Sequence, residues 1–84
     1  MSPKKRIIIV DDHPLFREGL KTIIKRDTKY EVVGEAGTGH QGFELAKKLK
    51  PDLALVDMAL PDQTGIQLIR NTVKISSETR VLVV

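Results

Sequence analysis

The residues Ile7–Pro14, which read IIIVDDHP, give the strongest indication of the fold. The first half, Ile7–Val10, is apolar and β-branched with no polar alternation, which is typical of a strand buried on both faces of a parallel sheet. The second half stops that strand with two acids, a histidine and a proline. Proline is tolerated in the first turn of a helix, where the N–H it lacks needs no partner. These residues therefore predict a central strand that leads through an acidic turn into a helix.

The rest of the chain continues this alternation of helix and strand. Apolar residues at helical spacing predict helices at Phe16–Ile24, Phe43–Leu49 and Ile66–Val73. Further strands are predicted at Tyr30–Ala36, Leu53–Val56 and Val81–Val84. The first of these is less apolar than the others, as an edge strand is, and the second is expected to be fully buried. The predicted fold class is α/β: a βαβαβαβ chain forming a flavodoxin-like parallel sheet with helices on both faces.

Length and composition limit the classes of protein that the chain can represent. Its 84 residues allow one small domain, and the absence of cysteine excludes a disulfide framework and a thiolate zinc site. The net charge of +3 comes from the N-terminus and one predicted helix, so a solvated helix face explains it better than a nucleic-acid surface. No apolar run approaches the length of about 20 residues that a membrane span needs, so no membrane segment and a cytoplasmic location are expected.

The sequence ends inside the last apolar strand, Val81–Val84, with no polar ending and no following helix. An open strand of this kind pairs readily with another chain. We therefore expect strand-edge pairing or a homodimer at this strand. We also expect the sequence to be the N-terminal part of a larger domain, truncated after its fourth strand.

Three carboxylates follow buried strands: Asp11 and Asp12 after the first, and Asp57 after the third. All carboxyl ends of parallel strands share one edge, and ligands bind there where the strand order reverses. Three neighbouring carboxylates repel one another, and Mg²⁺ relieves that repulsion through oxygen ligands. An aspartate beside such an ion can accept a phosphoryl group as a nucleophile. The alternative is that each aspartate only caps the helix behind it.

The residues Val10–Leu20, VDDHPLFREGL, resemble the start of a response-regulator receiver domain. They are closest to the subgroup whose output is a LuxR/NarL-type helix-turn-helix. Further similarity lies in Val32–Ala36, Lys50–Asp57, Leu60–Pro61 and Arg80–Val84. The resemblance implies a CheY-like fold and makes residues 1–84 a receiver domain that is incomplete at its C-terminus, without its DNA-binding output domain.

By this resemblance Asp57 accepts a phosphoryl group from a sensor histidine kinase in a two-component system. Asp11, Asp12, Asp57 and the backbone carbonyl of Ala59 would hold Mg²⁺. The implied function is a regulated binding module and not an enzyme, with transcription controlled through DNA binding by the absent output domain. The family also uses a Ser or Thr after the fourth strand and a Lys after the fifth, and no residue here can be assigned either role. Asp62 stands where the subgroup often has glycine.

One alternative is a dinucleotide-binding, Rossmann-like fragment. Gly37, Gly39 and Gly42 match G-x-G-x-x-G between a predicted strand and helix, and Asp57 follows Gly37 by 20 residues, as a ribose-binding acid would. However, this pattern lies on the second strand–helix turn, whereas a dinucleotide fingerprint lies on the first. A dinucleotide site would also leave Asp11 and Asp12 unexplained.

Two other chemistries are less well supported by the spacing of the residues. A phosphatase with an aspartyl nucleophile usually has a second Asp two residues after the first, and His13 occupies that position after Asp11. With His13 and His40 as the only histidines, and no cysteine, a transition-metal site is not expected. His13 is interpreted as a loop residue near the acids.

Overall fold

The computed structural model describes residues 3–62, 67, 70 and 78–84. Within the described residues, four strands and two helices can be delimited: β1 (Lys5–Val10), α1 (Pro14–Lys25), β2 (Tyr30–Ala36), α2 (Gly39–Leu49), β3 (Leu53–Val56) and β4 (Arg80–Val83). The predicted helix at 66–73 lies outside the described residues except for Gln67 and Arg70, which are helical. Its apolar stripe of Ile66, Ile69 and Val73 is not described.

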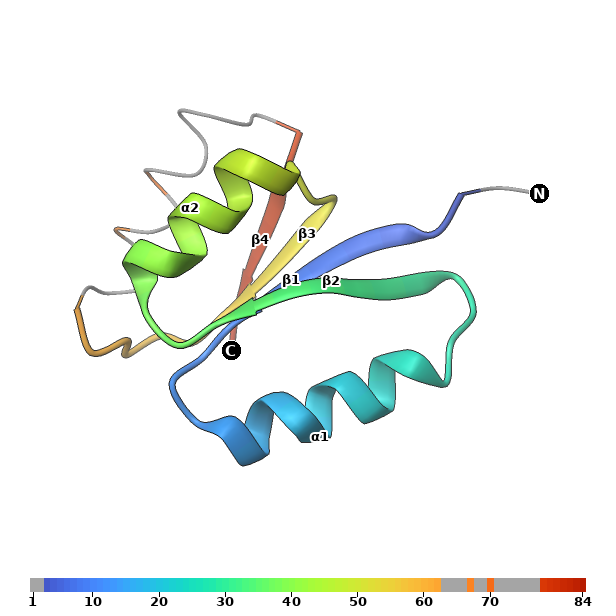
Figure 1. The fold of residues 1–84 in the computed structure, drawn as a ribbon, viewed down its shortest axis with the longest axis horizontal. Coiled ribbons are helices and arrows are strands. Elements are labelled where there is room, and N and C mark those ends of the chain that lie inside the picture. Colours follow the sequence, from blue (N-terminus) through green and yellow to red (C-terminus); the bar gives the residue numbers. More distant parts are fainter. Residues whose placement is uncertain (1–2, 63–66, 68–69, 71–77) are drawn as a thin grey trace.

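The strands form one parallel sheet in the order β2-β1-β3-β4, which confirms the flavodoxin-like topology. The connection through α1 runs from β1 to β2, and the one through α2 runs back past β1 to β3. Because such crossovers are right-handed, connections in opposite directions place their helices on opposite faces of the sheet. Figure 1 shows α1 and α2 on these two sides.

Burial follows the predicted strands closely but not completely. Every residue of Ile7–Val10 is buried, as expected for the central strand, and β2 lies at an edge of the sheet. In β3 only Ala54 and Val56 are buried, so the prediction of full burial is wrong for Leu53 and Leu55, which are half-buried. These two residues pair with Ile7 and Ile9. On that face α1 packs chiefly against β2, which leaves β3 partly exposed.

The main core lies between α2 and the sheet. Its buried members are Ile8, Val10, Ala36, Ala46, Ala54, Val56 and Leu60. Helix α2 lies close to β1 because Gly42 has no side chain: a Cβ built there would be 2.7 Å from Cγ2 of Val10. The helix ends at Lys50, which has a left-handed backbone with φ 45°, and Pro51 follows. The end of β1, directly before the acidic turn, is therefore packed into this core.

The fourth strand is Arg80–Val83, one residue earlier than predicted. The ladder nevertheless continues past its end, because the amide of Val84 donates to the carbonyl of Val56 across 2.8 Å. In the described part of the chain, no helix has the length and hydropathy needed to cross a membrane.

Candidate functional site

The backbone ladder brings the three predicted acids together at the carboxyl edge of the sheet. The amide of Asp11 donates to the carbonyl of Ala36, and that of Asp57 donates to the carbonyl of Val10, both at 2.9 Å. Asp11 and Asp57 are therefore each held one residue beyond their strand, in register with a neighbouring strand. Ligand atoms of Asp11, Asp12, His13 and Asp57 all lie within 4.8 Å of one another. The predicted convergence of the acids is confirmed.

Short turns orient two of these carboxylates. Oδ1 of Asp11 accepts a hydrogen bond from the amide of His13 at 2.7 Å, and Oδ1 of Asp57 accepts one from the amide of Ala59 at 3.2 Å. The N-cap of α1 is His13, whose side chain makes no capping hydrogen bond. The side chains of Asp11 and Asp57 therefore each stabilise the turn that follows their strand, and both belong to the same cluster. Helix capping alone does not explain why these acids lie together.

The cluster is open to solvent unevenly. The side chain of Asp11 is 6% exposed, that of Asp57 18% and that of Asp12 37%. A groove of about 470 Å³ beside the cluster is lined by Asp11, His13, Leu15, Phe16, Asp57 and Val84. A reactant can thus reach Asp57 from solvent through this groove, past the apolar side chains of Leu15, Phe16 and Val84. Asp11 remains buried below it.

His13 belongs to the cluster, although the sequence suggested only a nearby loop residue. Its Nδ1 lies 2.8 Å from Oδ1 of Asp11, 3.0 Å from Oδ1 of Asp12 and 3.9 Å from Oδ2 of Asp57. The hydrogen bond to Asp11, followed by the charge of Asp12, raises the pKa of His13 above 6.5. The imidazole therefore favours its charged form here and offsets the repulsion among the three acids. The signal in the sequence was its place directly after two acids and before a proline.

Sequence reasoning missed Arg17, which anchors the turn from the side of α1. Its Nη1 donates to the backbone carbonyl of Asp11, and its Nε donates to Oε1 of Glu35 at 3.0 Å. Lys21 donates to the other oxygen of Glu35 at 2.6 Å. These contacts tie the β1–α1 turn to the end of β2. The available signal was a basic residue one helical turn after His13.

The donor chemistry of the cluster fits Mg²⁺. Carboxylate oxygens are the protein ligands that this ion prefers, and the exposure of Asp12 and Asp57 leaves room for the waters that it retains. The amide of Ala59 is fixed by its bond to Asp57. The use of the carbonyl of Ala59 as a further ligand stays a prediction.

The glycine-rich turn is built for packing and not for a pyrophosphate. The first amides of α2, on Gly39 and His40, donate to the two carboxylate oxygens of Asp62 at 2.7 and 2.9 Å. Those are the amides with which a dinucleotide would bind at a helix N-terminus. Gly42 faces Val10, and no described glycine has a positive φ. The carboxylate of Asp62 therefore occupies the place at the start of α2 where the pyrophosphate of a dinucleotide would bind. The sequence analysis did not predict this contact.

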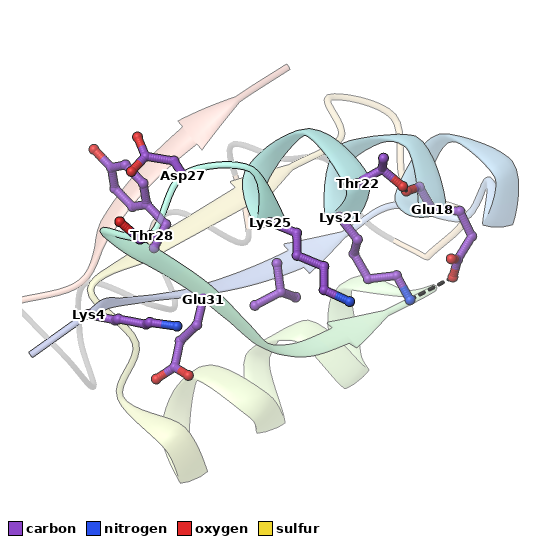
Figure 2. A pocket seen from close by; sticks show the side chains of 10 residues that line it. Lys4, Glu18, Lys21, Thr22, Lys25, Asp27, Thr28 and Glu31 are labelled. Carbon is purple, nitrogen blue, oxygen red and sulfur yellow. Dashed lines mark hydrogen bonds and ion pairs between the residues drawn. The ribbon is translucent and has the colours of Figure 1, made fainter.

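A separate hollow of about 500 Å³ lies between α1 and the start of β2. Its charged lining is balanced, with Lys4, Lys21 and Lys25 against Glu18, Asp27 and Glu31. Figure 2 shows Lys21 and Lys25 extending from α1, with Lys21 joined to Glu18. The charged residues that line this hollow therefore give it no net charge that would favour an anion or a cation.

A parallel sheet with helices on both faces, and with an acidic cluster where its strand order reverses, defines the class of the protein. It is a flavodoxin-like α/β domain with a candidate divalent-cation site. Comparison with known proteins gives the family. Residues 7–84 match the family model of the response regulator receiver domain. The chain belongs to this family, and it is a receiver domain of the two-component response regulators.

The individual relatives agree with this family. The chain is 40% identical over 77 residues to the nitrate/nitrite response regulator protein NarL of Escherichia coli K12, covering 92% of this chain and 36% of NarL. It is 39% identical over 75 residues to a protein-glutamate methylesterase/protein-glutamine glutaminase of Vibrio vulnificus, covering 89% of this chain and 22% of that protein. The chain therefore spans about a third or less of these relatives.

A solved structure supports the fold. The signal receiver domain of NarL from Mycobacterium tuberculosis superposes with a TM-score of 0.87 at 38% identity. The match covers 98% of this chain and 66% of that one. The resemblance to the NarL-type subgroup that the sequence suggested is thereby confirmed.

Proposed function

We propose that Asp57 is the phosphoryl acceptor of this receiver domain. The observation that carries the proposal is the position of Asp57 within the cluster that includes Asp11 and Asp12, all with ligand atoms within 4.8 Å. Asp57 is also the acid that combines a fixed turn with access to the groove, since its side chain is 18% exposed. Asp11 is too buried to meet a donor, and Asp12 is the more exposed partner for an ion.

The reaction is transfer of a phosphoryl group from a phosphohistidine on a sensor kinase. A carboxylate oxygen of Asp57 attacks phosphorus, the bond between phosphorus and the imidazole nitrogen breaks, and that nitrogen keeps the electron pair. The product is an acyl phosphate on Asp57 and a free histidine on the donor. The bond from the amide of Ala59 to Oδ1 holds the carboxylate in place, which leaves Oδ2 as the attacking atom.

Asp11, Asp12, Asp57 and the carbonyl of Ala59 would hold Mg²⁺. When bound, the ion supplies positive charge that neutralises the transferring phosphoryl oxygens. Arg17 supports this arrangement by holding the backbone of Asp11 against α1. The carboxylates of this chain would therefore act as ligands of the ion and, at Asp57, as the nucleophile.

For the whole protein, we infer that residues 1–84 form the N-terminal part of the receiver domain and that phosphorylation controls an output domain elsewhere in the protein. Another relative, 38% identical over 80 residues, is the transcriptional regulatory protein DegU of Brevibacillus brevis, and its name favours a DNA-binding output that controls transcription over the enzymatic output named for the Vibrio protein. The edge of β4, where Leu82 is 53% exposed, is the surface on which we expect pairing with another chain.

The test is chemical trapping of the acyl phosphate. The protein is incubated with acetyl phosphate and Mg²⁺, reduced with borohydride to convert a phosphorylated aspartate into homoserine, and mapped by peptide mass spectrometry. We expect homoserine at position 57, and none anywhere in the Asp57→Asn variant. Asp52→Asn, at the opposite end of β3, is the matched control and should be trapped like the unchanged protein. Trapping at another aspartate in the unchanged protein would overturn the assignment.

A further inference from the structure

The first two amides of α2 donate to one side chain from a distant loop. Such amides have no acceptor within their own helix and need one outside it. Oδ1 of Asp62 accepts from the amide of Gly39 at 2.7 Å, and Oδ2 accepts from the amide of His40 at 2.9 Å. The N-cap residue Thr38 supplies the acceptor for the next amide, that of Gln41, at 3.1 Å. Both carboxylate oxygens of Asp62 are therefore bound to the start of this helix.

Asp62 ends the segment that begins at the proposed phosphoryl acceptor. At the other end of this segment the amide of Asp57 is bound to β1, and between them the side chain of Leu60 is buried in the core. Pro61 connects Leu60 to Asp62. Proline fixes its own φ at about −65° and confines the residue before it to extended conformations, so this connection is stiff. A change in the position of Asp62 is therefore transmitted to the peptide between Ala59 and Leu60.

That peptide carries the carbonyl that we propose as a ligand of Mg²⁺. The amide of Ala59 is held by Oδ1 of Asp57 at 3.2 Å, but the carbonyl of Ala59 belongs to the following peptide, which this bond does not fix. The direction of the carbonyl depends instead on how the chain continues through Leu60 to Asp62. Asp62 is not a member of the acidic cluster, and its two oxygens are bound to α2. Any effect of its hydrogen bonds on the ion would therefore pass through Ala59.

We propose that Asp62 is a positioning residue of the phosphoacceptor site: it attaches the end of the segment from Asp57 to α2 and so directs the carbonyl of Ala59 toward the ion. This inference rests on the proposed function, because it requires that Mg²⁺ binds beside Asp57. The partial positive charge at the start of a helix favours a carboxylate there, which strengthens the attachment. Loss of the attachment allows the carbonyl of Ala59 to take other directions, and it weakens Mg²⁺ binding while every carboxylate of the acidic cluster is kept.

The experiment measures the dissociation constant of Mg²⁺ by calorimetry in the unchanged protein and in variants of Asp62 and Thr38. Thr38→Ala is the matched control, because it removes an acceptor from the same helix end and leaves Asp62 attached. We expect the dissociation constant to rise about tenfold in Asp62→Ala, the lower end of the effect of groups that orient a metal ligand, and to stay unchanged in Thr38→Ala. Asp62→Asn keeps one acceptor oxygen and should lie between the unchanged protein and Asp62→Ala.

A second readout follows the carbonyl of Ala59 itself. In the unchanged protein, the NMR resonance of this carbonyl carbon should shift when Mg²⁺ is added. In Asp62→Ala at the same fraction of bound ion, the shift should be smaller, because the carbonyl points toward the ion for less of the time. A shift of the same size in both proteins would contradict the proposed role of Asp62.

An unchanged Mg²⁺ affinity in folded Asp62→Ala would overturn this inference, and Asp62→Asn decides in the same way if Asp62→Ala does not fold. Equal weakening in Thr38→Ala would overturn it too, since the stability of α2 would then control the site. Equal weakening in Asp62→Asn and Asp62→Ala would show that only the charge of Asp62 attracts the ion, which also contradicts a positioning role.

Asp57→Asn separates failure of this inference from failure of the proposed function. If Mg²⁺ binding weakens in Asp57→Asn and is unchanged in Asp62→Ala, only the role of Asp62 is wrong. If Mg²⁺ binding does not depend on Asp57, the proposed site is wrong, and the role of Asp62 is wrong with it.

Discussion

The amide of Asp57 donates a hydrogen bond to the carbonyl of Val10 across 2.9 Å. This one bond extends the ladder between β1 and β3 by a residue, and it places the acid that follows β3 beside the two acids that follow β1. The register of the strands therefore positions the cluster.

Mg²⁺ should stabilise the folded protein, because the ion binds a cluster that exists only when the strands are paired. At a concentration one hundred times the dissociation constant, the gain in unfolding free energy should be about 2.7 kcal/mol. Thermal unfolding with and without Mg²⁺ measures it. Asp12→Asn should lose the gain, and Asp27→Asn, in the turn after α1, should keep it. If Mg²⁺ raised the unfolding free energy of Asp12→Asn as much as that of the unchanged protein, the ion would bind at another site.

Gly42 and Gly19 offer a matched pair of helix substitutions with opposite expected signs. A Cβ at Gly42 would lie 2.7 Å from Val10, whereas one at Gly19 would meet nothing within 4 Å. Gly42→Ala should therefore force α2 from β1 and destabilise the protein by about 1–3 kcal/mol. Gly19→Ala should stabilise it by about 0.5–1 kcal/mol through helix propensity. Urea unfolding of both variants checks this, and equal effects would contradict the close packing of α2 on β1.

Glu35 should make stability depend on acid pH. The ion pair with Lys21, aided by Arg17 and opposed by desolvation, lowers the pKa of Glu35 below 4.5. Its stabilising contribution is therefore complete above pH 4.5 and lost as the pH falls through the lowered pKa. Glu35→Gln should be less stable than the unchanged protein near neutral pH.

That difference should vanish in acid. Urea unfolding measured from neutral pH to well below 4.5 tests the prediction, with Glu44→Gln on the exposed side of α2 as control. A difference that persists unchanged at the acid end would mean that the ionised form of Glu35 is not what stabilises the fold.

Asp62 should act as a cap for α2 from a distant loop. Its carboxylate accepts from the amides of Gly39 and His40, so Asp62→Ala should reduce stability by about 1 kcal/mol and speed hydrogen exchange at those two amides. Asp62→Asn keeps one acceptor oxygen and should be intermediate. If the amides of Gly39 and His40 exchange as slowly in Asp62→Ala as in the unchanged protein, then the contact with Asp62 does not stabilise the start of α2 in solution.

Features of the structure that depend on residues close in the sequence could be predicted, whereas contacts between residues far apart in the sequence could not. Tyr30–Ala36 and Leu53–Val56 were predicted with the observed bounds because burial patterns are local, and the meeting of Asp11 with Asp57 follows from parallel strand geometry. The contact of Asp62 with Gly39 spans 23 residues and depends on how a loop returns to the sheet. The contact of Asp62 has no periodic signal in the sequence. Arg17 does lie one helical turn after His13, but that spacing does not show that it binds the backbone carbonyl of Asp11.

The most direct measurement is an anomalous difference map from a crystal of the protein soaked in Mn²⁺. The account predicts one peak at the carboxyl edge of the sheet, bonded at about 2.1–2.3 Å to oxygens of Asp57 and of Asp11 or Asp12. A protein that binds Mn²⁺ in solution, yet shows its peak away from Asp57 or on one of these acids alone, would contradict the shared site on which the proposed phosphoryl transfer depends.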